Sequence, residues 1–141
     1  SPQYPGIQDK KAGISVKELP AFPIIFREMG SSIRYVITNF CETHRITPNV
    51  RIESGSLAFI KDLVIQGHGL SFFTRAAVSN DIQNHHLLAI PILEGNPLLN
   101  IDIIFRKKSL FSHAARAFMD IIEAEKRDGA FKGFHCTDPT V

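Results

Sequence analysis

The chain has 141 residues, of which 44% are apolar and 21% are charged, and its formal net charge is +2. These values predict a packed core, room for one domain and hardly for two, and no nucleic-acid binding driven by charge alone. No apolar run approaches the roughly 20 residues of a membrane helix, and the first residues lack the basic start and apolar core of a secretory signal. We therefore expect a cytoplasmic protein without membrane contact. Because residue 1 is not Met, we interpret the chain as a piece of a longer protein.

The first third of the chain predicts one strand and one helix. Residues 1–13 hold several Pro and Gly residues and few apolar anchors, so we predict a linker or loop. An apolar run at 23–27 predicts a buried strand, and the turn Gly30-Ser31-Ser32 can begin and cap a helix over 31–44. The apolar residues of that helix fall on one face, at Ile33, Val36, Ile37, Phe40 and Cys41.

The rest of the chain alternates strand and helix signals. Asn49–Glu53 alternates as a strand does, and the turn Ser54-Gly55-Ser56 precedes a predicted helix over 57–66. The remaining predicted elements are a strand over 68–74, a short helical turn or loop over 76–86, a strand over 87–93 with Pro91 at a sheet edge, a strand over 100–106, and a helix from Ser112 to about Glu125 with Ala115, Phe118, Met119 and Ile122 facing inward.

This order predicts an α/β fold with a mostly parallel sheet flanked by helices. In such sheets ligands bind where the carboxyl ends of strands meet helix N-termini, and both serine turns lie at such ends. If the first two strands are neighbours, the turns face one pocket with hydroxyls, backbone N–H groups and helix dipoles suited to a small carboxylate. Arg27 is placed to clamp the anion, whereas we expect Arg34 on the outer face. The alternative is that these serines only cap helices.

Other chemistry finds little support in the sequence. Cys41 and Cys136 are expected to be free thiols, as suits a reducing compartment. No set of His and Cys residues has zinc-ligand spacing, and Gly67-His68-Gly69 lacks the pattern of a dinucleotide-binding loop, so we expect neither a metal nor a cofactor. No nucleophile motif and no paired carboxylates are visible, which disfavours an enzyme.

Several stretches together carry a family resemblance. They are Pro23-Ile-Ile-Phe26, Gly30-Ser-Ser-Ile-Arg34 with Phe40 and Pro48, Ser54, Leu63-Val-Ile-Gln-Gly-His-Gly-Leu-Ser-Phe-Phe73, Pro91, Ile101–Phe105 and Ala117-Phe118. From about Ile14 to Ile122 the chain resembles the effector-binding domain of LysR-type transcriptional regulators. That domain consists of two Rossmann-like subdomains of the type II periplasmic-binding-protein fold, with a small effector in the cleft between them.

The resemblance implies a division of the chain and a set of ligand-binding residues. Residues 1–13 would be a linker or loop from the first subdomain, 14–104 the second subdomain, 105–126 a returning strand end and helix of the first subdomain, and 127–141 a polar tail. The implied ligand-binding residues lie at the strand end near Arg27 and Glu28, in the two serine turns, and in the segment where the family often has Leu-Pro. They are Arg27, Gly30, Ser31, Ser32, Ser54, Gly55, Ser56, Phe73 and Thr74.

The resemblance also implies what the chain does. It would sense a small effector, which we expect to be a carboxylate, for a transcription regulator that contacts DNA only through a winged helix-turn-helix absent from this chain. The helix beginning at Ser112 would favour self-association through its apolar face. Two alternatives are a solute-binding lobe related to periplasmic transport proteins and a small α/β enzyme. The sequence does not name the effector, the target promoter or the direction of regulation.

Overall fold

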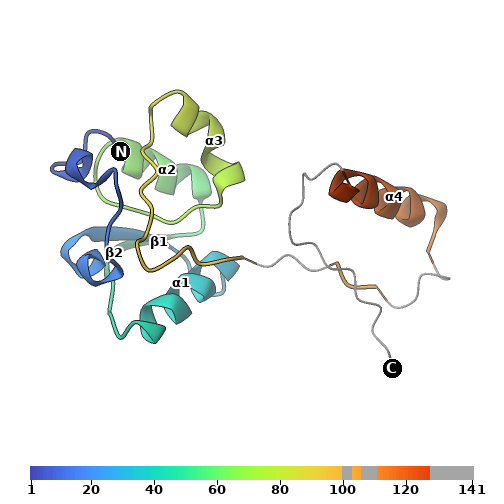
Figure 1. Ribbon diagram of the computed structural model, residues 1–141, viewed down its shortest axis with the longest axis horizontal. Helices are drawn as coiled ribbons and strands as arrows, with labels where there is room; N and C mark the ends of the chain where they lie inside the picture. Colours follow the sequence, from blue (N-terminus) through green and yellow to red (C-terminus); the bar gives the residue numbers. More distant parts are fainter. Residues whose placement is uncertain (100–102, 106–110, 128–141) are drawn as a thin grey trace. The chain divides into compact units, whose positions relative to one another are not determined.

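The computed structural model describes residues 1–99, 103–105 and 111–127, in two compact units divided after Leu99. Figure 1 shows the elements of each unit. In the first unit they are the 3-10 helices η1 (Ile7–Lys10) and η2 (Val16–Ala21), strands β1 (Pro23–Arg27) and β2 (Asn49–Ser54), and helices α1 (Ser32–Thr43), α2 (Leu57–Ile65) and α3 (Arg75–Gln83). The second unit contains α4 (His113–Arg127).

Strand β1 is the centre of a parallel arrangement. On one edge it pairs in parallel with β2, in a register that ends with Arg27 opposite Ser54. On the other edge Ile25 N–H donates to the Leu70 carbonyl at 2.8 Å, and Leu70 N–H donates to the Pro23 carbonyl at 2.9 Å. Leu70 therefore bridges β1 in parallel as well. The expected parallel sheet flanked by helices is confirmed for these elements.

Successive residues of β1 point to opposite faces, and each face is covered by helices. Ile24 and Phe26 pack in one buried cluster with Ile37 of α1. Ile25 packs in another, with Ile60 of α2 and with Val64 and Val78. Figure 1 accordingly shows α1 on one side of the strands and α2 and α3 on the other. A parallel strand covered on both faces reads as an unbroken apolar run, which is why 23–27 was recognisable in the sequence.

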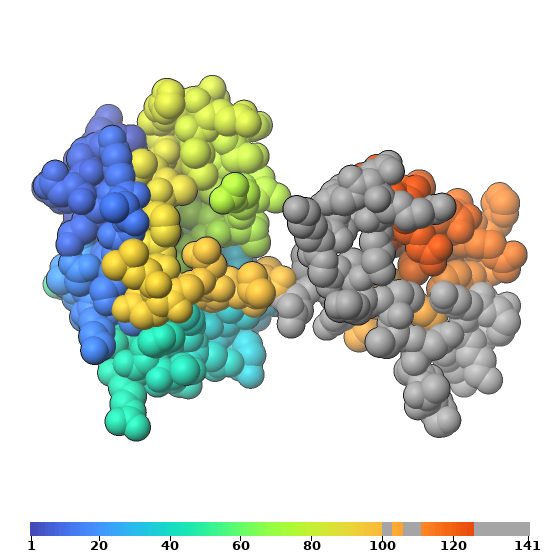
Figure 2. All heavy atoms as spheres, in the orientation of Figure 1, coloured from blue at the N-terminus to red at the C-terminus, as the bar shows by residue number. Residues whose placement is uncertain are grey.

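The N-terminal segment, expected to be a linker or loop, packs against the first unit. The side chain of Ile7 is fully buried, and Ser1 Oγ donates to the Ile65 carbonyl at 2.8 Å. Ile14 forms a parallel bridge to Ile92, so the start of the chain lies beside residues near 92, the blue and yellow surfaces of Figure 2. Few apolar residues anchor this segment, and the sequence therefore carried no periodic signal for it.

Three predicted elements differ from those observed. The segments 68–74 and 87–93 were expected to be strands, but each makes a single isolated bridge, at Leu70 and at Ile92. Residues 76–86, expected to be a short helical turn or loop, contain most of the regular helix α3. The strand predicted over 100–106 lies largely outside the described residues, and 103–105 are not in a strand.

Arg34 was expected on the outer face of its helix, and this is wrong. Its side chain is only 16% exposed, and Nη1 lies 2.8 Å from Glu53 Oε1. The same nitrogen donates to the Arg27 carbonyl at 2.9 Å, and the guanidinium lies 4.3 Å from the ring centroid of Phe26. Arg34 therefore ties the first turn of α1 to both strands. Its position on a helix gave no sign of this, because the partners come from other elements.

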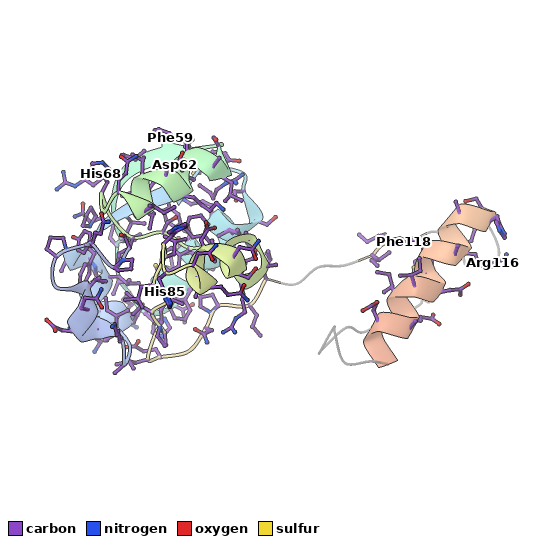
Figure 3. The ribbon with its side chains drawn as sticks, turned by 90° about the horizontal axis from the view of Figure 1, so that it is seen from above. Phe59, Asp62, His68, His85, Arg116 and Phe118 are labelled. Atoms are coloured by element: carbon purple, nitrogen blue, oxygen red, sulfur yellow. The ribbon has the colours of Figure 1, made fainter. Side chains whose placement is uncertain are left out.

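Helix α4 begins as the sequence predicted. Ala115 N–H donates to Ser112 Oγ at 3.2 Å, which is a helix cap. Among the residues expected to face inward, Met119 is buried and Ala115 and Ile122 are half-buried, but Phe118 is exposed. Figure 3 shows Phe118 projecting from the helix. Neighbouring helical residues point about 100° apart, so Phe118 and Met119 do not share one narrow face.

The close approach at Gly69 gives a test of the fold. A Cβ on Gly69 would lie 2.5 Å from the Pro23 carbonyl oxygen, a backbone atom that Leu70 also binds. Gly69→Ala should therefore lower the free energy of unfolding by about 1–3 kcal/mol, measured by urea denaturation with circular dichroism. Gly55→Ala is the control, because its nearest contact would be an ordinary 3.7 Å. Equal stability of the two variants would contradict this packing.

The contacts of Arg34 give a second test. Arg34→Lys keeps the charge but loses the planar fork that reaches Glu53 and the Arg27 carbonyl together. We expect a loss of about 1–2 kcal/mol of unfolding free energy in urea denaturation. Arg51→Lys, at an exposed position of β2, should change it by less than about 0.5 kcal/mol. If Arg51→Lys lowered the unfolding free energy as much as Arg34→Lys, the bonds of Arg34 to Glu53 and to the Arg27 carbonyl would make no specific contribution to stability.

Candidate functional site

The two serine turns lie at the same edge of the sheet. Arg27 and Ser54 are paired at the ends of β1 and β2, and Glu28 N–H donates to the Ser54 carbonyl at 3.2 Å. The Glu28 carboxyl carbon lies 3.7 Å from where a Cβ on Gly55 would stand. Parallel pairing thus brings the turn before α1 next to the turn before α2, as the sequence predicted for neighbouring strands.

The N-terminus of α1 carries hydrogen-bonding groups that are not used within the helix. Gly30 adopts φ +92°, a left-handed conformation that suits glycine, and Ser31 follows at the N-cap position. The Ser31 side chain makes no capping hydrogen bond, so its hydroxyl is not committed to the helix. The N–H groups of the first helical turn, beginning at Ser32, have no acceptor within the helix. Together they provide donors at the positive end of a helix dipole.

The turn before α2 uses its hydroxyls internally. Phe59 N–H donates to Ser56 Oγ at 3.3 Å, and Ser56 N–H donates to Ser54 Oγ at 3.1 Å. The alternative interpretation, in which a serine only caps a helix, therefore describes Ser56 but not the Ser31 side chain. The backbone of Gly55 lies beside the Glu28 carboxylate, whose atoms would be 3.7 to 3.9 Å from an added Cβ.

The parallel arrangement also directs the N-terminus of a third helix, α3, toward this edge of the sheet. Thr74 is the N-cap of α3 and makes no side-chain capping bond. Leu70 is paired in parallel with Ile24, and the chain contains no turn between Leu70 and Thr74, so Thr74 continues toward the same edge. Phe73 packs against the buried cluster beneath α2 and α3. The ring of Phe73 is only partly buried, so its expected contribution to a ligand site stays a prediction.

Arg27 is engaged by its sequence neighbour. Its Nε donates to Glu28 Oε2 and its Nη2 to Glu28 Oε1, both at 2.9 Å. These bonds, and one from its own backbone N–H, hold the pKa of Glu28 below its usual value. The sequence showed two adjacent opposite charges at a strand end, but not that they form a two-pronged pair, because side chains of adjacent strand residues ordinarily diverge.

The described part of the chain offers few other chemical sites. No group of three or more His, Cys, Asp or Glu residues there is arranged to hold a metal ion. His68 follows α2 and His85 follows α3, and Figure 3 shows them at separate positions. Cys41 is a free thiol whose burial raises its pKa, so it is poorly placed to react. None of the described helices is long and apolar enough to span a membrane.

Comparison with known sequences identifies the family. Residues 1–127 match the model of the LysR substrate binding domain. The transcriptional activator CmpR of Synechocystis is 33% identical over 125 residues, which cover 88% of this chain and 40% of CmpR. The phosphonates import ATP-binding protein PhnC of Anaeromyxobacter dehalogenans is 27% identical over 79% of this chain but only 23% of PhnC. The chain thus spans less than half the length of these curated relatives.

Comparison with solved structures agrees on the fold. The regulatory domain of Synechocystis CcmR, solved with 2-PG, matches with a TM-score of 0.65 and 24% identity over 81% of this chain and 55% of that one. The effector-binding domain of QuiR, solved with shikimate, matches with a TM-score of 0.66 and 18% identity over 90% and 59%. The fold is that of LysR effector-binding domains, of the type II periplasmic-binding-protein kind. The chain therefore belongs to the LysR substrate-binding domain family.

Proposed function

We propose that the chain is part of the effector-sensing domain of a LysR-type transcription regulator and that it binds a small anionic metabolite. The observation that carries the proposal is the pairing of Arg27 with Ser54, which brings the turns Gly30-Ser31-Ser32 and Ser54-Gly55-Ser56 to one edge of the sheet. Membership of the LysR family and the small ligands of CcmR and QuiR support the same function.

The chemistry of this edge suits a carboxylate. The Ser31 hydroxyl and the first N–H groups of α1 donate to its oxygens, and the helix N-terminus favours its negative charge. Arg27 supplies a guanidinium able to bind two oxygens at once. Thr74, at the N-cap of α3, adds a hydroxyl toward the same edge. Shikimate, the ligand of QuiR, is itself a small carboxylate.

Regulation follows from where such a site lies in the whole domain. An effector that prefers the closed cleft shifts the population toward that state and changes how the subunits present their DNA-binding heads. These heads belong to the full-length regulator, which acts in the cytoplasm, has no catalytic role and associates with itself, with the apolar face of α4 contributing. The recurrence of transcriptional regulators among the relatives favours this function over a solute-binding lobe of a transport system.

Ser31 provides the test of the site. Small carboxylates, shikimate included, would be screened against the 141-residue chain by thermal shift, and the affinity of each hit measured by isothermal titration calorimetry. Ser31→Ala should weaken binding about tenfold, because a hydrogen bond to a charged ligand is lost. Ser79→Ala is the matched control, since the Ser79 hydroxyl is bonded to the Ala76 carbonyl within α3. Unchanged affinity in Ser31→Ala would remove that hydroxyl from the site.

A further inference from the structure

The carboxylate of Glu28 lies between the two turns where a ligand anion is expected. The backbone N–H of Glu28 donates to the Ser54 carbonyl, and the backbone carbonyl of Glu28 accepts from Ser31 N–H at 3.3 Å. Glu28 is therefore bonded to both turns. Its carboxyl group lies against Gly55, 3.7 to 3.9 Å from the position of an added Cβ. The negative charge at this edge is therefore already supplied by the protein.

The guanidinium edge of Arg27 is already used by Glu28. Nε and Nη2 each donate to one carboxylate oxygen at 2.9 Å, the fork geometry that a bound carboxylate or phosphate adopts on arginine. Arg34 is not a substitute, because its Nη1 is bonded to Glu53 and to the Arg27 carbonyl. An incoming anion that uses this arginine must first replace Glu28.

We propose, resting on the function proposed above, that Glu28 is an internal competitor that the effector displaces from Arg27. The side chain of Glu28 is 42% exposed and that of Arg27 only 20%, so the carboxylate is the partner with room to swing away. The exchange selects the ligand. An anion with two oxygens in fork geometry, a carboxylate or phosphate, replaces what Arg27 loses, whereas a neutral ligand or a halide does not.

Removal of the competing charge tests the proposal in the 141-residue chain. Glu28→Gln keeps the size of the side chain but loses its charge, and it should bind shikimate and inorganic phosphate about tenfold more tightly in isothermal titration calorimetry. Chloride should gain much less. Glu53→Gln is the matched control, because Glu53 pairs with Arg34 rather than Arg27, and it should leave both affinities within about twofold.

The outcomes separate this proposal from the function on which it rests. If wild type binds either probe and Glu28→Gln binds it no more tightly, Glu28 is not a competitor although the site stands. If neither protein binds shikimate, phosphate or any carboxylate of the thermal-shift panel, the proposed function fails and this proposal fails with it. Circular dichroism spectra establish that the variants are folded.

A measurement on the wild type needs no variant. Carbon-13 NMR of the Glu28 carboxyl would follow its titration with and without saturating shikimate or phosphate. Displacement from Arg27 removes the first cause of its lowered pKa, so its pKa should rise toward the ordinary glutamate value when the ligand is bound. A pKa unchanged at saturation would show that the ion pair persists beside the ligand and would overturn the proposal.

Discussion

The parallel pairing of β1 with β2 is the constraint on which the candidate site depends. The register shifts between Ile24 and Ile25, so that Ile24 is opposite Val50 but Ile25 is opposite Ile52. Arg51 is the extra residue. If the register did not shift, Arg27 would be opposite Glu53 and the second serine turn would extend one residue beyond the first. This irregularity therefore aligns the two turns that precede α1 and α2.

Two arginines near this edge, Arg27 and Arg34, look alike in the sequence but have different partners in the structure. Arg34 is committed to structure: it contacts Glu53, a backbone carbonyl of β1 and the ring of Phe26, all from a nearly buried position. Among the described residues, the ion-pair partner of the Arg27 guanidinium is Glu28, its half-exposed neighbour in the sequence. An ion pair with one half-exposed partner contributes less to stability than a buried pair and exchanges more easily, which suits a residue that changes partner when a ligand arrives.

The rest of the first unit holds this edge in place from both faces. Each side of β1 packs against its own helices, Leu70 bridges β1 in parallel, and Ile14 before the strand bridges Ile92 after it. The Ser15 hydroxyl and the Val16 N–H both donate to the carboxylate of Glu94. These bonds lower the pKa of Glu94, and the bond from Ser15 has the largest effect. The packing on both faces of β1 thus positions the helix N-termini at this edge.

The sequence by itself determined the elements with strong local signals and the family to which they belong. Periodicity, glycine turns and serine caps predicted β1, α1, β2 and α2 and the α/β class, because these depend on residues near one another in the chain. The tertiary structure alone decided what depends on distant neighbours. The contacts of Arg34, the packing of Phe73 against the core and the packing of residues 1–13 all require partners from other elements. The pairing of Arg27 with Glu28 belongs with them, because Glu28 is also bonded through its N–H to the Ser54 carbonyl and lies beside Gly55, which come from the second serine turn.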